Sequence, residues 1–234
     1  MSRFRVIVIG LLLAVVVLLG AVVVLLVQRD GTGTVPAPGQ SAALEASGGE
    51  ESVIPEETPD ELDASVRLGA LQIVGGETFG LREGDAADCE TAAEDGVYTV
   101  SASTTRDTPL VVTVPEGESF DRTALTASGG SLSAEELDVQ ELYVACEQGS
   151  LRFSGRVSGD VEVEHLQGET VLELAGDPSE FNYEVSYELG HVQIGTQSYA
   201  GAKGSQSIDN GSEKTIRVHC AMGSVEIVFP EATA

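Results

Sequence analysis

Cysteines, histidines and acids are the residues of this chain that could bind a metal or catalyse a reaction. Cys89, Cys146 and Cys220 are an odd set, so at least one thiol has no internal disulfide partner. Neither a Cys-x-x-Cys nor a His-x3-His spacing occurs, and metal binding needs ligands at such spacings. We therefore expect no metal and no cofactor, and the thiols are expected to be buried or unreactive.

Nucleophilic catalysis would need one of the three histidines beside a Ser or Cys, oriented by a third group. His191 and His219 fall at outward or turn positions of the pattern described below, and no Gly-x-Ser-x-Gly motif is present. Glu162 and Glu164 are two apart on one strand face, as a glycosidase pair could be. With 38 acids in 234 residues such adjacency is common, so the sequence predicts no enzyme.

Residues 6–27 form an unbroken apolar run that is long enough to cross a bilayer. A cleaved secretory signal has a shorter apolar region and a small-residue cleavage site, whereas this run ends in Gln28, Arg29 and Asp30. An uncleaved anchor is favoured. Because Arg3 and Arg5 precede the run, residues 1–5 are expected to be cytoplasmic and the rest extracytoplasmic.

Residues 28–64 are rich in Gly, Pro, Ala and acid, which is typical of a disordered, self-repelling linker. A calcium-binding segment is the alternative, but no Asp-x-Asp-x-Asp-Gly spacing supports it. The formal charge of the whole chain is −26 at pH 7, so nucleic acid is not an expected partner. The folded domain is predicted to cover residues 65–234.

Beyond residue 65 a short module recurs: Gly, any residue, Leu or Val, any residue, then an apolar residue. Its alternation predicts strands with apolar residues on one face and polar residues on the other. A unit this short cannot bury its apolar face alone, so the units must stack. The copies are Gly69-Ala-Leu-Gln-Ile73, Gly130-Ser-Leu-Ser-Ala134, Gly149-Ser-Leu-Arg-Phe153, Gly159-Asp-Val-Glu-Val163, Gly190-His-Val-Gln-Ile194 and Gly223-Ser-Val-Glu-Ile227.

A seventh copy, Gly168-Glu-Thr-Val-Leu-Glu-Leu174, is longer by one residue and is expected to carry a bulge. The predicted fold class is all-β: a repeat-built β-solenoid or β-helix-like ectodomain behind a single transmembrane helix. An antiparallel sandwich is the alternative, and Asp209-Asn-Gly211 would form a hairpin turn between Ile208 and Ile216. Cys146 and Cys220 occupy matching places with several modules between them, so we predict that they are not bonded to each other.

The segment Pro109-Leu-Val-Val-Thr-Val-Pro115, the Ala127-Ser-Gly-Gly-Ser-Leu132 module and the closing Gly223-Ser-Val-Glu-Ile227 resemble the bacterial putative-adhesin family of β-strand-repeat surface proteins. The resemblance covers about residues 65–230. It implies an extracytoplasmic coiled β fold behind one N-terminal anchor, with adhesion inferred and no catalytic residues. The long acidic linker and the cysteines at two repeat positions depart from the family pattern.

The leading functional hypothesis is a non-catalytic, adhesin-like or structural protein of the cell membrane that contacts envelope polymers or surface proteins. Extended repeat domains bind along their outer faces. The candidate binding row holds Arg152, Asp160, Glu162, Gln193 and Glu226.

A second hypothesis is a regulatory membrane subunit that reports envelope stress. Gly10 and Ala14 have the spacing of a helix-packing motif and could pair its membrane helix with a partner. A glycan-acting β-helix enzyme is a third, but few Lys or Arg residues are available to support its site.

Overall fold

The computed structural model describes residues 58–82, 85 and 87–230, and this part of the chain is all-β. Its one 3₁₀ helix is η1 (Pro178–Glu180). The strands are β1 (Glu61–Leu68), β2 (Ala70–Gly76), β3 (Gly80–Leu81), β4 (Cys89–Glu94), β5 (Val97–Ser103), β6 (Leu110–Pro115), β7 (Ser119–Ala127), β8 (Ser131–Cys146), β9 (Gly149–Val157), β10 (Val161–His165), β11 (Gly168–Leu174), β12 (Phe181–Ile194), β13 (Gln197–Ala200), β14 (Gly204–Ile208) and β15 (Lys214–Val228).

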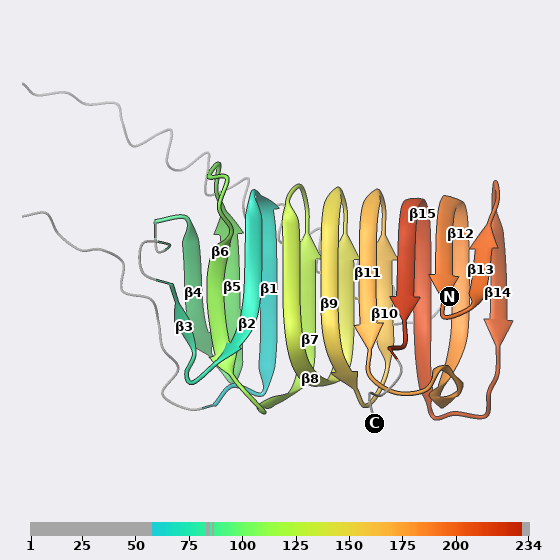
Figure 1. The fold of residues 1–234 in the computed structure, drawn as a ribbon, viewed down its shortest axis with the longest axis horizontal. Coiled ribbons are helices and arrows are strands. Elements are labelled where there is room, and N and C mark those ends of the chain that lie inside the picture. Colours follow the sequence, from blue (N-terminus) through green and yellow to red (C-terminus); the bar gives the residue numbers. More distant parts are fainter. Residues whose placement is uncertain (1–57, 83–84, 86, 231–234) are drawn as a thin grey trace, which may run out of the picture. The chain divides into compact units, whose positions relative to one another are not determined.

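The strands wind into stacked coils that have two sides (Figure 1). The β1 side runs in the order β4, β5, β1, β7, second half of β8, β10, first half of β15, first half of β12, β14. The β2 side runs β3, β6, β2, first half of β8, β9, β11, second half of β15, second half of β12, β13. All pairs are parallel except those of β3, β4, β13 and β14, so the predicted parallel stacking of repeats is confirmed and an antiparallel sandwich is wrong.

Inward residues of both sides form one core. On the β1 side Val144, Val163 and Val218 lie side by side on consecutive coils, and each is at most 2% exposed. On the β2 side Phe153, Leu172 and Ile227 are stacked in the same way. Each such side chain contributes roughly 1.5–3 kcal/mol by burial. The in-and-out alternation predicted for the Gly modules is therefore confirmed.

Glycines stack along the edge where the chain passes from the β1 side to the β2 side. A Cβ on Gly149 would lie 2.0 Å from the Gly130 carbonyl oxygen, and a Cβ on Gly168 would lie 2.0 Å from that of Gly149. Both glycines have positive φ, 130° and 119°. Only glycine lets the coils approach this closely, which explains why the module begins with that residue.

The seventh module carries no bulge, contrary to the expectation. Gly168 pairs with Gly149 and Thr170 with Leu151 without a register shift. Thr170 therefore takes an inward position that other coils give to Leu or Val, and it is fully buried. Its hydroxyl is satisfied by His165, which the sequence pattern did not reveal.

Strand order does not follow chain order at either end of the stack. The first coil, β1 and β2, lies between β5 and β6 on one flank and β7 and β8 on the other. The last strand, β15, lies between β12 on one flank and β10 and β11 on the other. Both terminal segments of the described chain are thus enclosed by later or earlier coils.

Asp209-Asn-Gly211 is not the hairpin turn that the sequence suggested. Ile208 ends β14, which pairs antiparallel with β12, whereas Ile216 lies in β15, which pairs parallel with β12 on its opposite edge. The loop 209–213 therefore crosses the beginning of β12 instead of joining two neighbouring strands.

The folded domain begins earlier than predicted, because β1 starts at Glu61 and both Leu62 and Ala64 are buried. The cytoplasmic tail 1–5, the apolar run 6–27 with Gly10 and Ala14, and most of the linker 28–64 lie outside the described residues. Within the part of the chain that is described, no helix has the length and apolar character needed to cross a membrane.

Candidate functional site: a polar hollow beside the last coils

The predicted binding row is divided between the two sides of the stack. Arg152, Glu226 and Gln193 lie on the β2 side in one lateral column, with Val171 between Arg152 and Glu226. Glu162 lies on the β1 side, where it pairs in register with Arg217, and Asp160 directly precedes β10 on that side. The five residues therefore do not form a single row, because alternation distinguishes outward from inward but not one side from the other.

Asp160 is engaged within the protein. Its carboxylate accepts from the Thr215 backbone N–H at 2.8 Å and pairs with Arg217 at 2.8 Å. Arg217 also lies 3.5 Å from Glu184 on the next strand. The hydrogen bond to Asp160 raises the pKa of Arg217, so the guanidinium is held in place as a cross-strand tie.

His165 lies in the core, where no solute can reach it. It is 1% exposed, and its Nδ1 is 2.9 Å from Thr170 Oγ1. Its Nε2 has no hydrogen-bond partner. Burial lowers the pKa of His165, although backbone groups of Gly168 and Met222 act in the opposite direction.

Cys146 and Cys220 lie opposite His165 on its two neighbouring strands. They are thus only two strands apart, not several modules apart as expected, because a single strand, β10, separates them. Two strand spacings are about 9.6 Å, still beyond the roughly 7 Å Cα limit for a disulfide. Both thiols are free and buried, and burial raises the pKa of each. Among the described residues no group of His, Cys, Asp or Glu has metal-binding geometry.

The other two histidines are exposed, as predicted, and each contacts a serine. His219 Nδ1 is 3.0 Å from Ser186 Oγ, and His191 Nε2 is 2.9 Å from Ser198 Oγ. The Ser186 hydroxyl also lies 3.3 Å from the Val218 carbonyl, to which it donates. A hydroxyl whose proton is directed at a carbonyl accepts from the histidine and is not activated as a nucleophile.

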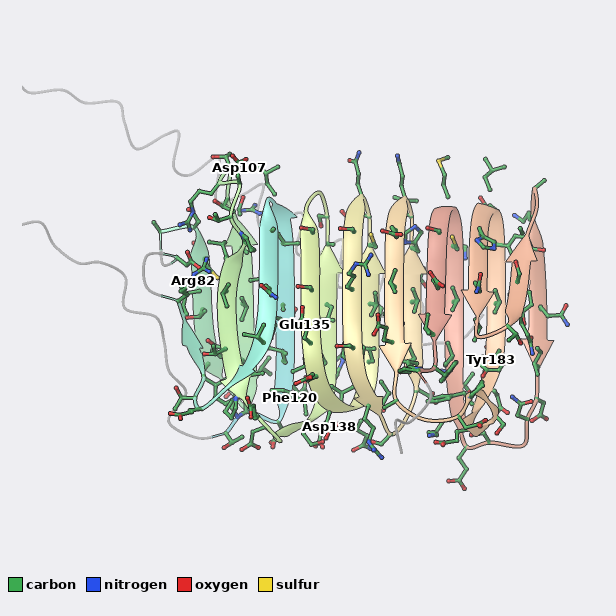
Figure 2. The ribbon with its side chains drawn as sticks, viewed as in Figure 1. Arg82, Asp107, Phe120, Glu135, Asp138 and Tyr183 are labelled. Atoms are coloured by element: carbon green, nitrogen blue, oxygen red, sulfur yellow. The ribbon has the colours of Figure 1, made fainter. Side chains whose placement is uncertain are left out.

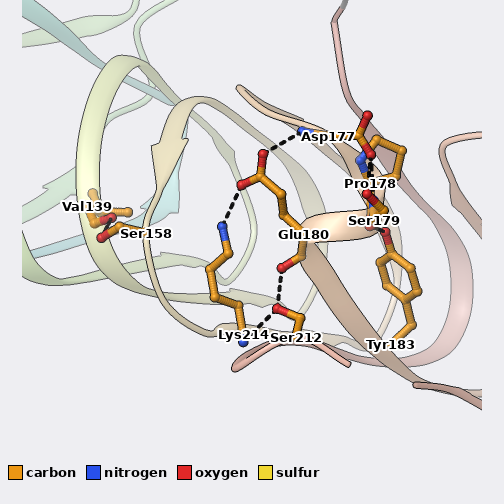
Figure 3. A network of polar contacts seen from close by, with 9 residues as sticks. All are labelled: Val139, Ser158, Asp177, Pro178, Ser179, Glu180, Tyr183, Ser212 and Lys214. Carbon is orange, nitrogen blue, oxygen red and sulfur yellow. Dashed lines mark hydrogen bonds and ion pairs between the residues drawn. The ribbon is translucent and has the colours of Figure 1, made fainter. Parts of the chain in front are cut away.

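A polar hollow of about 560 Å³ lies where β9 ends, where η1 begins and where the chain enters β15. Figure 3 shows polar contacts that join Asp177, Glu180, Ser212 and Lys214 beside it. Polar groups (hydroxyl, amide, backbone and charged) and apolar groups contribute similar shares of its lining. Sequence reasoning did not identify this place. Its lining residues are Arg156, Val157, Ser158, Ala175, Gly176, Ser179, Glu180, Asn210, Gly211, Ser212, Glu213 and Lys214.

One wall of the hollow is the capped helix η1. Asp177 Oδ1 accepts from the Ser179 N–H at 2.8 Å, and Glu180 Oε1 accepts from the Asp177 N–H at 3.2 Å. This reciprocal pair is a capping box. The Tyr183 hydroxyl donates to the Pro178 carbonyl, and burial raises the pKa of Tyr183 to about 12. The Asp-x-x-Glu spacing in the sequence could have indicated this wall.

The adjoining wall is the loop 209–213, where the Ser212 hydroxyl donates to the Glu180 carbonyl of η1. Two asparagines fasten this loop to β12. Asn182 Nδ2 donates to the Ser212 carbonyl at 2.7 Å, and Asn182 Oδ1 accepts from the Asn210 N–H at 2.8 Å. Asn210 Nδ2 in turn donates to the Phe181 carbonyl at 2.7 Å. The loop therefore has a fixed conformation, although it belongs to no strand.

An ion pair joins η1 to the first residue of β15. Lys214 Nζ lies 2.8 Å from Glu180 Oε2 and 4.3 Å from the centre of the Phe181 ring. Lys214 lowers the pKa of Glu180, so the pair stays charged near neutral pH. Arg156 is exposed at the rim, and no ion pair within the described residues includes it. The hollow thus offers Arg156 as an available donor beside hydroxyl and amide groups.

Comparison with known proteins gives likenesses to solved structures. No family model matches the chain, and no curated protein matches it. A crystal structure described as that of a putative cell adhesion protein from Clostridium sporogenes is similar at 15% sequence identity, with a TM-score of 0.43. The match covers 77% of this chain and 97% of that one.

Proposed function

We propose that this protein is a non-enzymatic interaction protein of the cell envelope, anchored by residues 6–27, whose coiled β domain binds a hydroxyl-rich envelope polymer. The observation that carries the proposal is the polar hollow with its fixed walls. The hydroxyls of Ser158, Ser179 and Ser212 already donate within the protein, so their oxygens can serve as acceptors. The available Arg156 guanidinium supplies the donor, and together these groups can bind the hydroxyls of a sugar chain.

The negative charge of the protein indicates which class of envelope polymer it binds. The formal charge of −26 repels polyanions at long range, so a neutral glycan is favoured over an anionic one. Arg156 then acts as a planar hydrogen-bond donor at the rim and not as a counter-ion. The domain has no need to move, because η1 and the loop 209–213 are already fastened.

The test compares two arginines of similar exposure. The full chain in detergent is titrated with neutral glycan fractions and with anionic envelope polymers, first as wild type and then as Arg156→Ala and Arg152→Ala. We expect saturable binding of a neutral glycan, a loss of about tenfold or more with Arg156→Ala because a charged donor is removed, and no change with Arg152→Ala.

Other outcomes reassign the site or reject it. A loss with Arg152→Ala alone would move binding to the outward residues of the β2 side. No saturable binding of wild type to any polymer would contradict the proposed function. Thermal unfolding of each variant checks that the fold is intact, since Arg156 makes no ion pair in the described residues whose loss would destabilise it.

A further inference from the structure

The outer edge of β14 is open. β14 pairs with β12 along one edge, and no strand of the described chain lies on the other. Residues 205–207 are exposed. Unpaired N–H and C=O groups on such an edge can pair with a strand of another chain.

This edge has none of the usual protection by charge. No Asp or Glu occurs between Glu188 and Asp209, and Lys203 is the sole Lys or Arg there. In contrast, the segment 77–95, which supplies β3 and β4 at the opposite end of the stack, contains seven acids. In so acidic a protein, a second copy can approach the β14 end against far less like-charge repulsion.

The end of the core beside β14 is only partly covered. Tyr187, Tyr199 and Ile208 pack against the core but keep part of their surface in solvent. Tyr199 lies in β13 and Ile208 in β14, so both belong to the terminal strands. A partner that extends the sheet would bury more of this apolar surface.

We propose that two copies of this chain associate through β14, pairing antiparallel about a two-fold axis at Gln206. This register overlaps all five residues of the strand and places Ser205 opposite Ser207 of the second copy. It also places Lys203 opposite Asp209 of the second copy, and symmetry makes that contact twice. Lys203 already contacts Glu188 at 2.8 Å, so its charge would be shared between two carboxylates.

A cysteine on the axis tests the register directly. In an antiparallel pair the Cα atoms of facing residues are about 4.5–5.5 Å apart, within disulfide range. The full chain in detergent carrying Gln206→Cys should form a covalent dimer under mild oxidation, whereas Glu90→Cys on the edge strand β4 should not. The three native cysteines are buried and do not compete. Equal crosslinking at both positions, or none at either, overturns the proposal.

Charge exchange gives a second test with the same readout. In the Gln206→Cys background, Lys203→Asp should reduce crosslinking at least fivefold, and so should Asp209→Lys. Combining the two substitutions should restore it, because the contact between copies is rebuilt with reversed sign. A combined variant that stays monomeric, or a crosslink to a different protein, would reject pairing in this register. Glycan binding at the hollow is measured separately, so failure of one proposal is distinguishable from failure of the other.

Discussion

At each end of the coil stack the core and the outermost strand face solvent, and the two ends differ in how this surface is covered. At the β3–β4 end, Asp85 is 2% exposed and pairs with Arg82 and Arg106, each at 3.2 Å. Phe79 lies beneath, 5.0 Å from Tyr98 between ring centres. At the β13–β14 end the ion pair between Lys203 and Glu188 is exposed, and the partly exposed Tyr199 and Ile208 finish the core. Figure 2 labels Arg82 near the first end and Tyr183 near the second.

The difference shows that the end of a parallel stack can be covered by a buried ion cluster or can keep an edge strand that is free to pair with another chain. A buried, paired carboxylate fixes the β3–β4 end, and the surrounding acids repel another copy. The uncharged β14 edge has neither feature. We therefore expect the two ends to differ in stability, in access to solutes and in response to pH.

The largest effect is expected from Asp85→Ala. Besides the two arginines, Asp85 Oδ2 accepts from the Val111 N–H at 3.0 Å, so the substitution removes the acceptor of that N–H and the carboxylate that Arg82 and Arg106 share. Arg106 retains its ion pair with Asp88 at 2.9 Å. Both guanidiniums are more than a third exposed and are screened by solvent, so the expected loss is about 1–3 kcal/mol, the cost of leaving a buried N–H without its acceptor. Denaturant unfolding measures this loss of unfolding free energy, and Asp107→Ala, which changes an exposed residue at the same end, is the control. A loss below about 1 kcal/mol would show that this cap is not what closes the end.

The second largest effect is expected in the reactivity of cysteine thiols at the two ends of the stack. Burial, with Asp85 and Glu90 nearby, raises the pKa of Cys89 in β4 to about 11. At pH 8 the thiolate fraction is then at least about a hundredfold smaller than for an ordinary thiol. Alkylation kinetics should show Cys89 reacting at least that much more slowly than an exposed cysteine introduced by Ser205→Cys in β14. Similar rates at the two positions would contradict a closed β3–β4 end.

Mild acid should loosen the half of the stack that contains His165. Its pKa is lower folded than unfolded, so the unfolded chain binds the extra proton and stability falls as the pH drops below about 6.5. The loss is at most about 1.4 kcal/mol per pH unit. Hydrogen exchange at pH 5 and pH 7 should show that protection decreases at the lower pH in β10, β11 and β15 before it decreases in β1 and β5. The pair His165→Leu with Thr170→Val should remove this difference; persistence would implicate other groups.

The smallest effect is expected from Lys203→Gln at the β13–β14 end. Lys203 and Glu188 are exposed, so their ion pair is screened by solvent. The denaturation midpoint of the monomer at low protein concentration should not change measurably. A clear decrease would mean that this end, too, depends on a charged cap.

Much of the fold could be predicted because the Gly module indicates which side chains of a strand point inward and where the chain turns. Alternation identified Leu151 and Phe153 as inward, and the module glycines other than Gly159 marked the edge where the chain passes from the β1 side to the β2 side. Position in the stack could not be predicted in this way. Arg152 and Glu162 are both outward but on different sides, and β15 returns to the interior of the stack from the end of the chain. The hollow depends on the position of β15 inside the stack. That position brings Lys214 and the loop 209–213 to the same hollow as Arg156.

The enclosed positions of β1 and β15 also bear on how such a domain is made and how it can change. β15 fills a gap between coils that are synthesised earlier, so this half of the domain cannot close until β15 has emerged from the ribosome. Neither β1 nor β15, the first and last strands of the described chain, lies at an end of the stack, so a coil joined directly to either strand would not extend it. Extra coils at the ends of the described stack would have to be inserted beside β3 and β4 or beside β13 and β14.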